Sequence, residues 1–166
     1  MTSDPQGRCS RPARGRRLFH YTALHHAEDI MRSGGISRGG IPIPSADGAR
    51  LERVERGWQW LTTSDDWAQP WATRKVVRCD RTEVRFVVEV PLLELHRLRR
   101  WDAVAADFGY RPLIAQAFAD LAGGDSSAWH VFQGTIPHSW LRGVEKRPGL
   151  GDAVAPCAAW AQEVAR

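Results

Sequence analysis

The 166-residue sequence lacks several features that would assign it to a class at once. No apolar run approaches the roughly 18 residues of a membrane-spanning helix, and no apolar stretch follows the basic N-terminus as in a secretory signal. Cys9, Cys79 and Cys157 form no Cys-x-x-Cys pair, which excludes a zinc ribbon and a disulfide framework and leaves at most one bridge open. We therefore expect a soluble, cytoplasmic protein without membrane contact.

Familiar nucleotide-binding and catalytic motifs are also missing. The sequence contains no Walker loop, no Gly-x-Gly-x-x-Gly and no Gly-x-Ser-x-Gly elbow. His20, His25 and His26 do not form His-Glu-x-x-His. Metal sites need several ligands on one face with supporting carboxylates, so we expect no metal.

Lysine is scarce: two lysines stand against 21 arginines, and the net charge is +4. Residues 1–17 hold five arginines and one aspartate, so the remainder is formally neutral. We predict that 1–17 is a disordered arm and that 18–166 forms a single domain. The arm either binds nucleic-acid phosphates or merely reflects an arginine-rich composition.

Hydrophobic periodicity predicts interspersed strands and helices. We expect strands at 18–21, 58–63, 83–90 and 129–133 because apolar residues there cluster or alternate. A helix capped by Thr22 should follow the first strand and end at Gly34. Further helices are expected at 98–108, from Pro112 onward and weakly at 152–164, whereas 36–57 reads as a long loop. Without a regular βαβ period, the predicted class is α+β with a small split sheet and flanking helices.

Polar side chains gather where three predicted strands end. These clusters are His20, Tyr21 and Thr22; Thr62, Thr63 and Ser64; and His130 with Gln133. Side chains at strand ends can enter a cleft while the backbone stays rigid. We expect His20 and the hydroxyls of Thr62 and Thr63 to face one another across a nucleotide-sized crevice. A single histidine at the end of a strand is more often structural, so the prediction depends on the three clusters taken together.

Three segments follow one another in a suggestive order. They are Leu18-Phe19-His20-Tyr21-Thr22 with the later Ser33-Gly34-Gly35-Ile36 turn, Trp60-Leu61-Thr62-Thr63-Ser64, and Val131-Phe132-Gln133-Gly134-Thr135-Ile136-Pro137. In order and spacing they resemble the first, second and third core segments of the ADP-ribosyltransferase-like superfamily. The nearest branches are nucleic-acid-modifying bacterial toxins and RNA 2′-phosphotransferases.

The resemblance implies a split sheet with NAD⁺ bent in a cleft between its halves. His20 would bond a ribose hydroxyl, and the neighbouring backbone at Tyr21 and Thr22 would hold the nicotinamide amide. Tyr21, Trp60 and Trp71 are candidates to stack on the nicotinamide ring. Thr62, Thr63 and Ser64 resemble the Ser-Thr-Ser corner that orders such clefts.

The third segment departs from the family pattern. Transferases of this superfamily usually carry a glutamate at its start, but the sequence reads Ala128-Trp129-His130-Val131-Phe132-Gln133. The resemblance therefore assigns catalysis to His20 together with His130 or Gln133. An RNA 2′-phosphotransferase, whose branch also lacks this glutamate, and a non-catalytic nucleotide- or nucleic-acid-binding module remain open.

Eight tryptophans are a high number for this length. Large amphipathic rings usually fill core margins, so packing is the first interpretation. The alternative is that two or three of them form a stacking platform for nicotinamide or an unpaired base.

Together these features predict an NAD-dependent ADP-ribosyltransferase, a glycosyltransferase that uses NAD as co-substrate and no metal. Its acceptor would be a nucleic acid or a protein. The resemblance also implies a toxin or phage-defence setting, with an antitoxin as a candidate partner.

Overall fold

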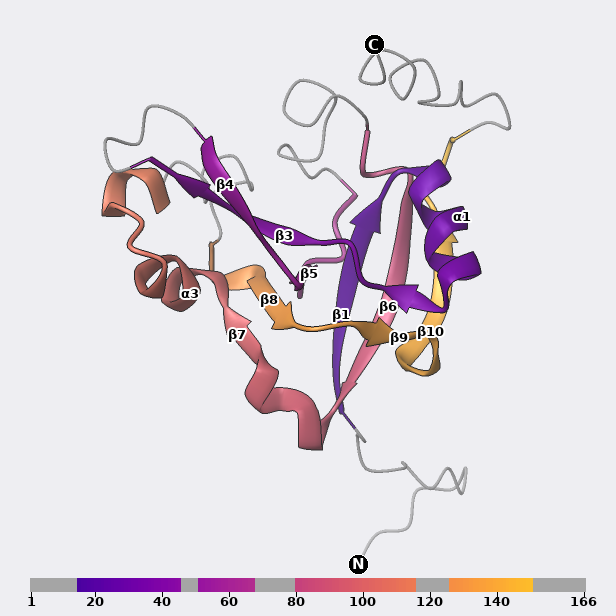
Figure 1. Ribbon diagram of the computed structural model, residues 1–166. Coiled ribbons are helices and arrows are strands. Elements are labelled where there is room, and N and C mark those ends of the chain that lie inside the picture. Colours follow the sequence, from indigo (N-terminus) through magenta and orange to yellow (C-terminus); the bar gives the residue numbers. More distant parts are fainter. Residues whose placement is uncertain (1–14, 46–50, 68–79, 116–125, 151–166) are drawn as a thin grey trace, which may run out of the picture.

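The computed structural model describes residues 15–45, 51–67, 80–115 and 126–150 (Figure 1). An antiparallel six-stranded sheet runs in the order β10-β6-β1-β5-β8-β7. Its strands are β1 (Gly15–Thr22), β5 (Trp58–Thr62), β6 (Val84–Pro91), β7 (Leu98–Arg100), β8 (Trp129–Gln133) and β10 (Leu141–Lys146). Two small sheets pair β2 (Gly35–Ile36) with β9 (Ile136–Pro137) and β3 (Gly40–Pro44) with β4 (Leu51–Arg56). The chain is thus an α+β protein with few helices.

The large sheet divides into two halves. Strands β1 and β6 share eight register pairs, and β5 and β8 share five. Between β1 and β5 there is one register pair, Phe19 with Thr62. We call this junction the seam; β10, β6 and β1 lie on one side of it and β5, β8 and β7 on the other.

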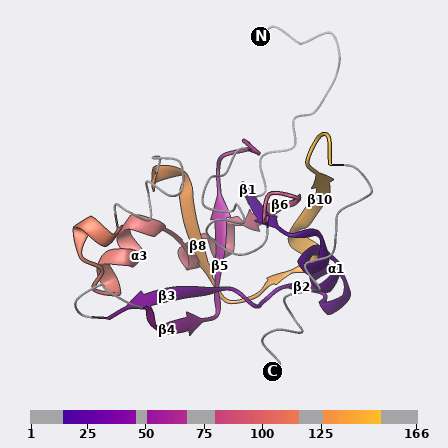
Figure 2. The same cartoon turned by 90° about the horizontal axis from the view of Figure 1, so that it is seen from above.

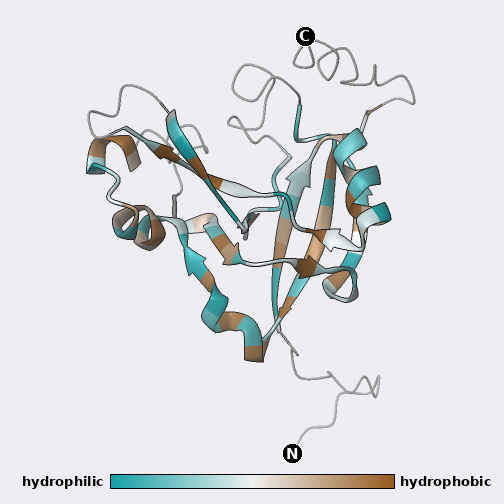
Figure 3. Ribbon diagram, viewed as in Figure 1, coloured by the Kyte–Doolittle hydropathy of each residue, from teal (hydrophilic) through white to brown (hydrophobic). Residues whose placement is uncertain are grey.

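One face of the sheet packs against α1 (Leu24–Ser33), and we call it the α1 face. Its core spans the seam, because Leu18 of β1, Phe86 of β6, Leu61 of β5 and Phe132 of β8 belong to one buried cluster. Ala27 of α1 joins this cluster. The outer turns of α1 are hydrophilic, whereas β6 is largely apolar (Figure 3). Alternation along the strands therefore produces the core.

The opposite face carries two smaller cores. Beyond the seam, α3 (Trp101–Asp107) and the β3–β4 hairpin cover β5 and β8, with Ile41, Ile43 and Trp101 buried. Figures 1 and 2 show α3 and the hairpin beside this half of the sheet and α1 beside the other. On the β1 side, Phe19 and Tyr21 pack with Val87 and Trp67. Each half thus has a separate core on this face.

Arg85 completes the β1-side core of the opposite face. Its guanidinium lies 4.8 Å from the ring centre of Phe19 and 4.6 Å from that of Trp67. Its Nε donates to Glu145 at 2.7 Å, and one terminal nitrogen donates to the Tyr21 hydroxyl at 3.3 Å. The arginine therefore combines stacking with charge-assisted hydrogen bonds.

We expect Arg85→Met to destabilise the fold by about 2–3 kcal/mol, because stacking and the hydrogen bonds to Glu145, to Tyr21 and to the Asp65 carbonyl are lost together. Arg142→Met is the matched control: Arg142 also pairs with a glutamate, at 2.7 Å, but its side chain is 52% exposed against 14% for Arg85. That change should cost less than about 1 kcal/mol. Urea unfolding of both variants tests this, and equal losses would contradict it.

Helix α1 begins differently from the prediction. Ala23, not Thr22, is the N-cap residue and makes no side-chain cap. The Leu24 amide instead donates to the carboxylate of Glu83 at 2.9 Å, 59 residues away in sequence. The predicted exit is confirmed: Gly34 adopts the left-handed conformation with φ 83°.

Two other predicted elements were wrong. The expected loop at 36–57 contains β2, β3 and β4, because Ile41 and Ile43 alternate inward while Pro42 and Pro44 take the less buried positions. The expected helix at 98–108 starts only at Trp101. Its first three residues pair with β8 as β7, so tertiary pairing overrides helical spacing there.

Strand β1 begins at Gly15, so residues 15–17 of the predicted arm belong to the sheet. Residues 1–14, the three cysteines and the expected helix at 152–164 lie outside the described residues. Of the segment predicted to be helical from Pro112 onward, residues 112–115 are helical, and the rest also lies outside. No helix formed by the described residues is long and apolar enough to cross a membrane.

Candidate functional site

The three polar clusters lie on adjacent strands, β1, β5 and β8, but alternation divides them between the two faces. Register partners in an antiparallel sheet point to the same face. Phe19 pairs with Thr62, and Leu61 pairs with His130. His20 follows Phe19 and therefore shares the α1 face with Leu61 and His130. The expected crevice formed by the His20, Thr62 and Thr63 side chains together is corrected: Thr62 faces the other way.

His20 is fixed across the seam. Its Nδ1 lies 2.9 Å from the carbonyl oxygen of Trp60. A carbonyl can only accept, so Nδ1 carries the proton and Nε2 is an acceptor. Burial lowers the pKa of His20 to about 4; the Trp60 carbonyl opposes this, and the positive charge of Arg81 and proximity of His26 add to it. The imidazole is thus neutral near pH 7, with one fixed tautomer.

His130 has a similar arrangement on the same face, with Leu61 of β5 between it and His20. Its Nδ1 lies 3.1 Å from the carbonyl oxygen of Ala128, which also accepts the Thr63 amide at 3.0 Å. Burial lowers the pKa of His130. Thr63 is exposed and follows the end of β5, so His20 and His130 are the predicted residues that the sheet places on one face.

The hydroxyl groups of Thr62 and Ser64 stabilise the turn after β5. Thr62 is fully buried, and its Oγ1 accepts the Ser64 amide at 3.0 Å. The Ser64 hydroxyl accepts the Asp66 amide at 3.3 Å. Tyr21 lies on the opposite face and donates its hydroxyl to the Ser64 carbonyl at 3.3 Å. Thr22 is buried on the α1 face, next along β1 from His20 on that face.

The aromatic candidates pack rather than line a common site with His20. Trp60 alternates to the opposite face, where its ring centre lies 4.7 Å from that of Trp101, and its indole N–H donates to the Gly40 carbonyl at 2.9 Å. Trp60 is therefore corrected to a packing residue, as is Tyr21, whose ring meets Trp67 edge-on. Trp71 lies outside the described residues.

Gln133 is also separated from His20. It pairs with Trp58, which lies on the opposite face at the far end of β5, and its side chain is exposed. A residue three positions after His130 alternates to the other face. Gln133 and His20, predicted to act together, therefore lie on opposite faces of the sheet.

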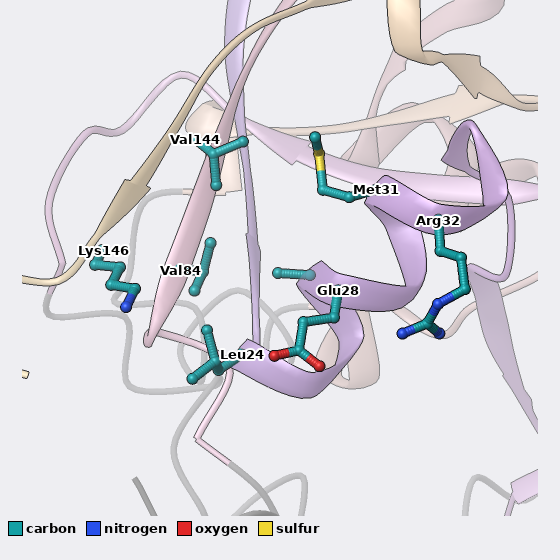
Figure 4. A pocket seen from close by; sticks show the side chains of 8 residues that line it. Leu24, Glu28, Met31, Arg32, Val84, Val144 and Lys146 are labelled. Atoms are coloured by element: carbon teal, nitrogen blue, oxygen red, sulfur yellow. The ribbon is translucent and has the colours of Figure 1, made fainter. Parts of the chain in front are cut away.

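A hollow of about 500 Å³ lies elsewhere, between α1, β6 and β10 (Figure 4). Leu24, Met31, Val84 and Val144 point toward one another around it. Its wall is mainly apolar, and none of the predicted site residues lines it. Nucleotide sites need convergent polar groups, so this hollow does not fit one.

His26 and Arg81 join the candidate site; the sequence analysis weighed His26 only as a metal ligand and did not connect Arg81 with His20. The first turn of α1 carries His26, and the turn before β6 carries Arg81; the charge of Arg81 acts on both His20 and His26. No local pattern signals this, because the Glu83 to Leu24 hydrogen bond that joins the two turns spans 59 positions.

Comparisons with known proteins supply no further assignment. No family model matches the chain, and no curated protein matches it. Within the described part of the chain, no three or more His, Cys, Asp or Glu side chains are grouped to hold a metal ion. The site is therefore characterised by its own geometry.

Acid should destabilise the protein through His20 and His26. Burial lowers both pKa values to about 4, from 6.5. Protons therefore bind more readily to the unfolded chain, and this stability is present above about pH 6.5 and lost as the pH falls toward 4, by up to about 1.4 kcal/mol per pH unit for His20 and by less for the half-buried His26, which solvent screens.

The expected measurement is urea unfolding at about pH 7 and about pH 5, with His26→Asn beside the wild type. The variant should lose less stability between the two values, because one of the two imidazoles with a lowered pKa is gone. Identical losses in both proteins would contradict the assignment to His26.

Proposed function

We propose that the protein is an ADP-ribosyltransferase-like enzyme that cleaves NAD⁺ and transfers ADP-ribose to a nucleic-acid or protein acceptor. The single observation that carries the proposal is His20. Its imidazole is neutral and locked to the Trp60 carbonyl at the seam, with Nε2 left as the accepting nitrogen. An acceptor of this kind suits a ribose hydroxyl, the role that the family resemblance implies for this histidine.

The strand order supports the same proposal. The three segments that carry the resemblance lie in β1, β5 and β8, which are neighbours in the sheet although 110 positions separate His20 from His130. The sheet also divides between the first and second of them. A cleft between the halves is where the resemblance would place the dinucleotide.

The proposed chemistry breaks the bond between nicotinamide and ribose, which builds positive charge at the ribose carbon. His20 would hold the ribose through a hydroxyl, so that the reacting carbon is kept in one orientation. His20 and His130 both lie on the α1 face, and their imidazoles are neutral. They therefore add no positive charge that would oppose the cation forming at the ribose carbon.

The test uses NAD⁺ labelled in its adenylate part, incubated with the full chain alone and with DNA, RNA or a cell lysate. We expect release of nicotinamide and transfer of the label to an acceptor. Neither release nor transfer from any mixture would overturn the enzyme proposal.

A second candidate is a nucleotide-binding module without turnover. Its supporting observation is that no carboxylate occurs in the stretch Ala128-Trp129-His130-Val131-Phe132-Gln133, where the family usually has a glutamate, and that the β8 side chains on the α1 face are His130 and Phe132. For such a module, NAD⁺ would raise the melting temperature without releasing nicotinamide.

A further inference from the structure

Arg81 is a cation without an acidic partner in the described part of the chain. It is partly buried, and its Nε is fully buried without a hydrogen-bond partner. A buried guanidinium N–H without an acceptor has lost its bond to water and gained nothing in return. Because the Arg81 side chain is only partly buried, its guanidinium remains open to an anionic ligand.

The adjacent acids are already engaged. Asp80 accepts from the Thr82 amide at 2.8 Å and from Arg147 at 2.9 Å. Burial opposes ionisation of Asp80, but these bonds hold its pKa below the usual value. Glu83 accepts the Leu24 amide. Neither carboxylate is directed at Arg81, so the charge of Arg81 is left uncompensated by its neighbours.

The position of Arg81 joins it to His20 and His26. The Glu83 to Leu24 bond holds the turn before β6 against the first turn of α1, which includes His26. Register pairs between β1 and β6 continue to Thr22 and Val84, which places His20 on the strand beside this turn. One cation and two imidazoles thus surround the junction of β1, α1 and β6.

We infer that Arg81 and His26 form a subsite for one phosphate of a dinucleotide diphosphate, adjacent to the ribose position at His20. This inference rests on the proposed function and names the part of NAD⁺ that these residues would hold. The guanidinium would donate to phosphate oxygens, and the imidazole of His26 would add one N–H donor.

Charge favours a diphosphate over a phosphomonoester such as the 2′-phosphate of RNA. With the imidazoles neutral, Arg81 carries the charge of the three-residue cluster Arg81, His20 and His26, while the opposite charges of Arg38 and Asp29 also act on His26. Each phosphate of a dinucleotide carries one negative charge, whereas a phosphomonoester carries about −1.5 to −2 near neutral pH. The positive charge of Arg81 therefore matches the charge of one dinucleotide phosphate better than that of a phosphomonoester.

Calorimetric titration of the full chain with ADP-ribose, inorganic pyrophosphate and adenosine tests the inference. We expect Arg81→Gln to weaken ADP-ribose binding at least about tenfold, Arg81→Lys to weaken it less, and adenosine binding to stay unchanged. Arg111→Gln is the matched control, since Arg111 is exposed and lies beyond α3. The affinity of Arg111→Gln for ADP-ribose should equal that of the wild type.

The inference is overturned if Arg81→Gln binds ADP-ribose as tightly as the wild type, or if the wild type binds neither ADP-ribose nor pyrophosphate. It is also overturned if a 2′-phosphorylated RNA oligonucleotide binds through Arg81 and ADP-ribose does not. Should Arg81→Gln fail to fold, phosphorus NMR of ADP-ribose with the wild type and His26→Asn decides: shifts lost in the variant support the subsite, and unchanged shifts overturn it.

The two proposals can fail separately. If ADP-ribose binding depends on Arg81 but NAD⁺ is not cleaved, the subsite proposal stands and the enzyme proposal is wrong. If NAD⁺ is cleaved and Arg81→Gln binds ADP-ribose with unchanged affinity, the enzyme proposal stands and the subsite proposal is wrong.

Discussion

Replacing His20 by asparagine should lower nicotinamide release from NAD⁺ by on the order of 100-fold while the protein stays folded. The asparagine amide can still donate to the Trp60 carbonyl in place of Nδ1, but the acceptor at Nε2 is lost. His20→Asn therefore separates the structural hydrogen bond from the proposed contact with the ribose. Initial rates at saturating NAD⁺, together with circular dichroism, measure both parts.

The exposed His138 provides the control, because His138→Asn makes the same change outside the site. That variant should release nicotinamide at the wild-type rate. If His20→Asn keeps full activity, then His20 is a structural residue and the proposed anchor is wrong.

Leu61→Ala should cost about 2–5 kcal/mol of stability, the largest effect expected of any single truncation at the site. Leu61 is 0% exposed and lies on β5 in register with His130, within the core that spans the seam. Removing it leaves a cavity between the strands that carry the two histidines. We expect urea unfolding to shift to lower concentration with little change in slope.

Leu93→Ala is the matched control, because Leu93 is 88% exposed. The same chemical change there should alter stability by less than about 0.5 kcal/mol. Comparable losses at the two positions would mean that the seam is not held by a packed core.

The local sequence pattern was sufficient to predict the bounds of several strands in the sheet. Strand β8 has the predicted bounds, β5 differs from them by one residue at one end, β6 differs by one residue at each end, and Gly34 ends α1 as expected. In each case a short-range property decides: alternation along the strand, or the tolerance of glycine for positive φ.

The same alternation rule, applied strictly, would have improved the predicted site. Consecutive residues such as His20 and Tyr21, or Thr62 and Thr63, cannot both face one cleft from a regular strand. They were grouped because they lie at the ends of predicted strands. The register pairs then placed Tyr21 and Thr62 on the face opposite His20.

The sequence by itself determined where these strands run and which of their residues face inward, because those properties depend on neighbours a few positions away. Only the tertiary structure decided that β1 and β5 meet at a single register pair, that Glu83 caps α1, and that Arg81 lies beside His20 and His26. These arrangements join segments up to 61 positions apart through packing and hydrogen bonds. Such contacts depend on the competition among all possible pairings of the chain, which no local pattern records.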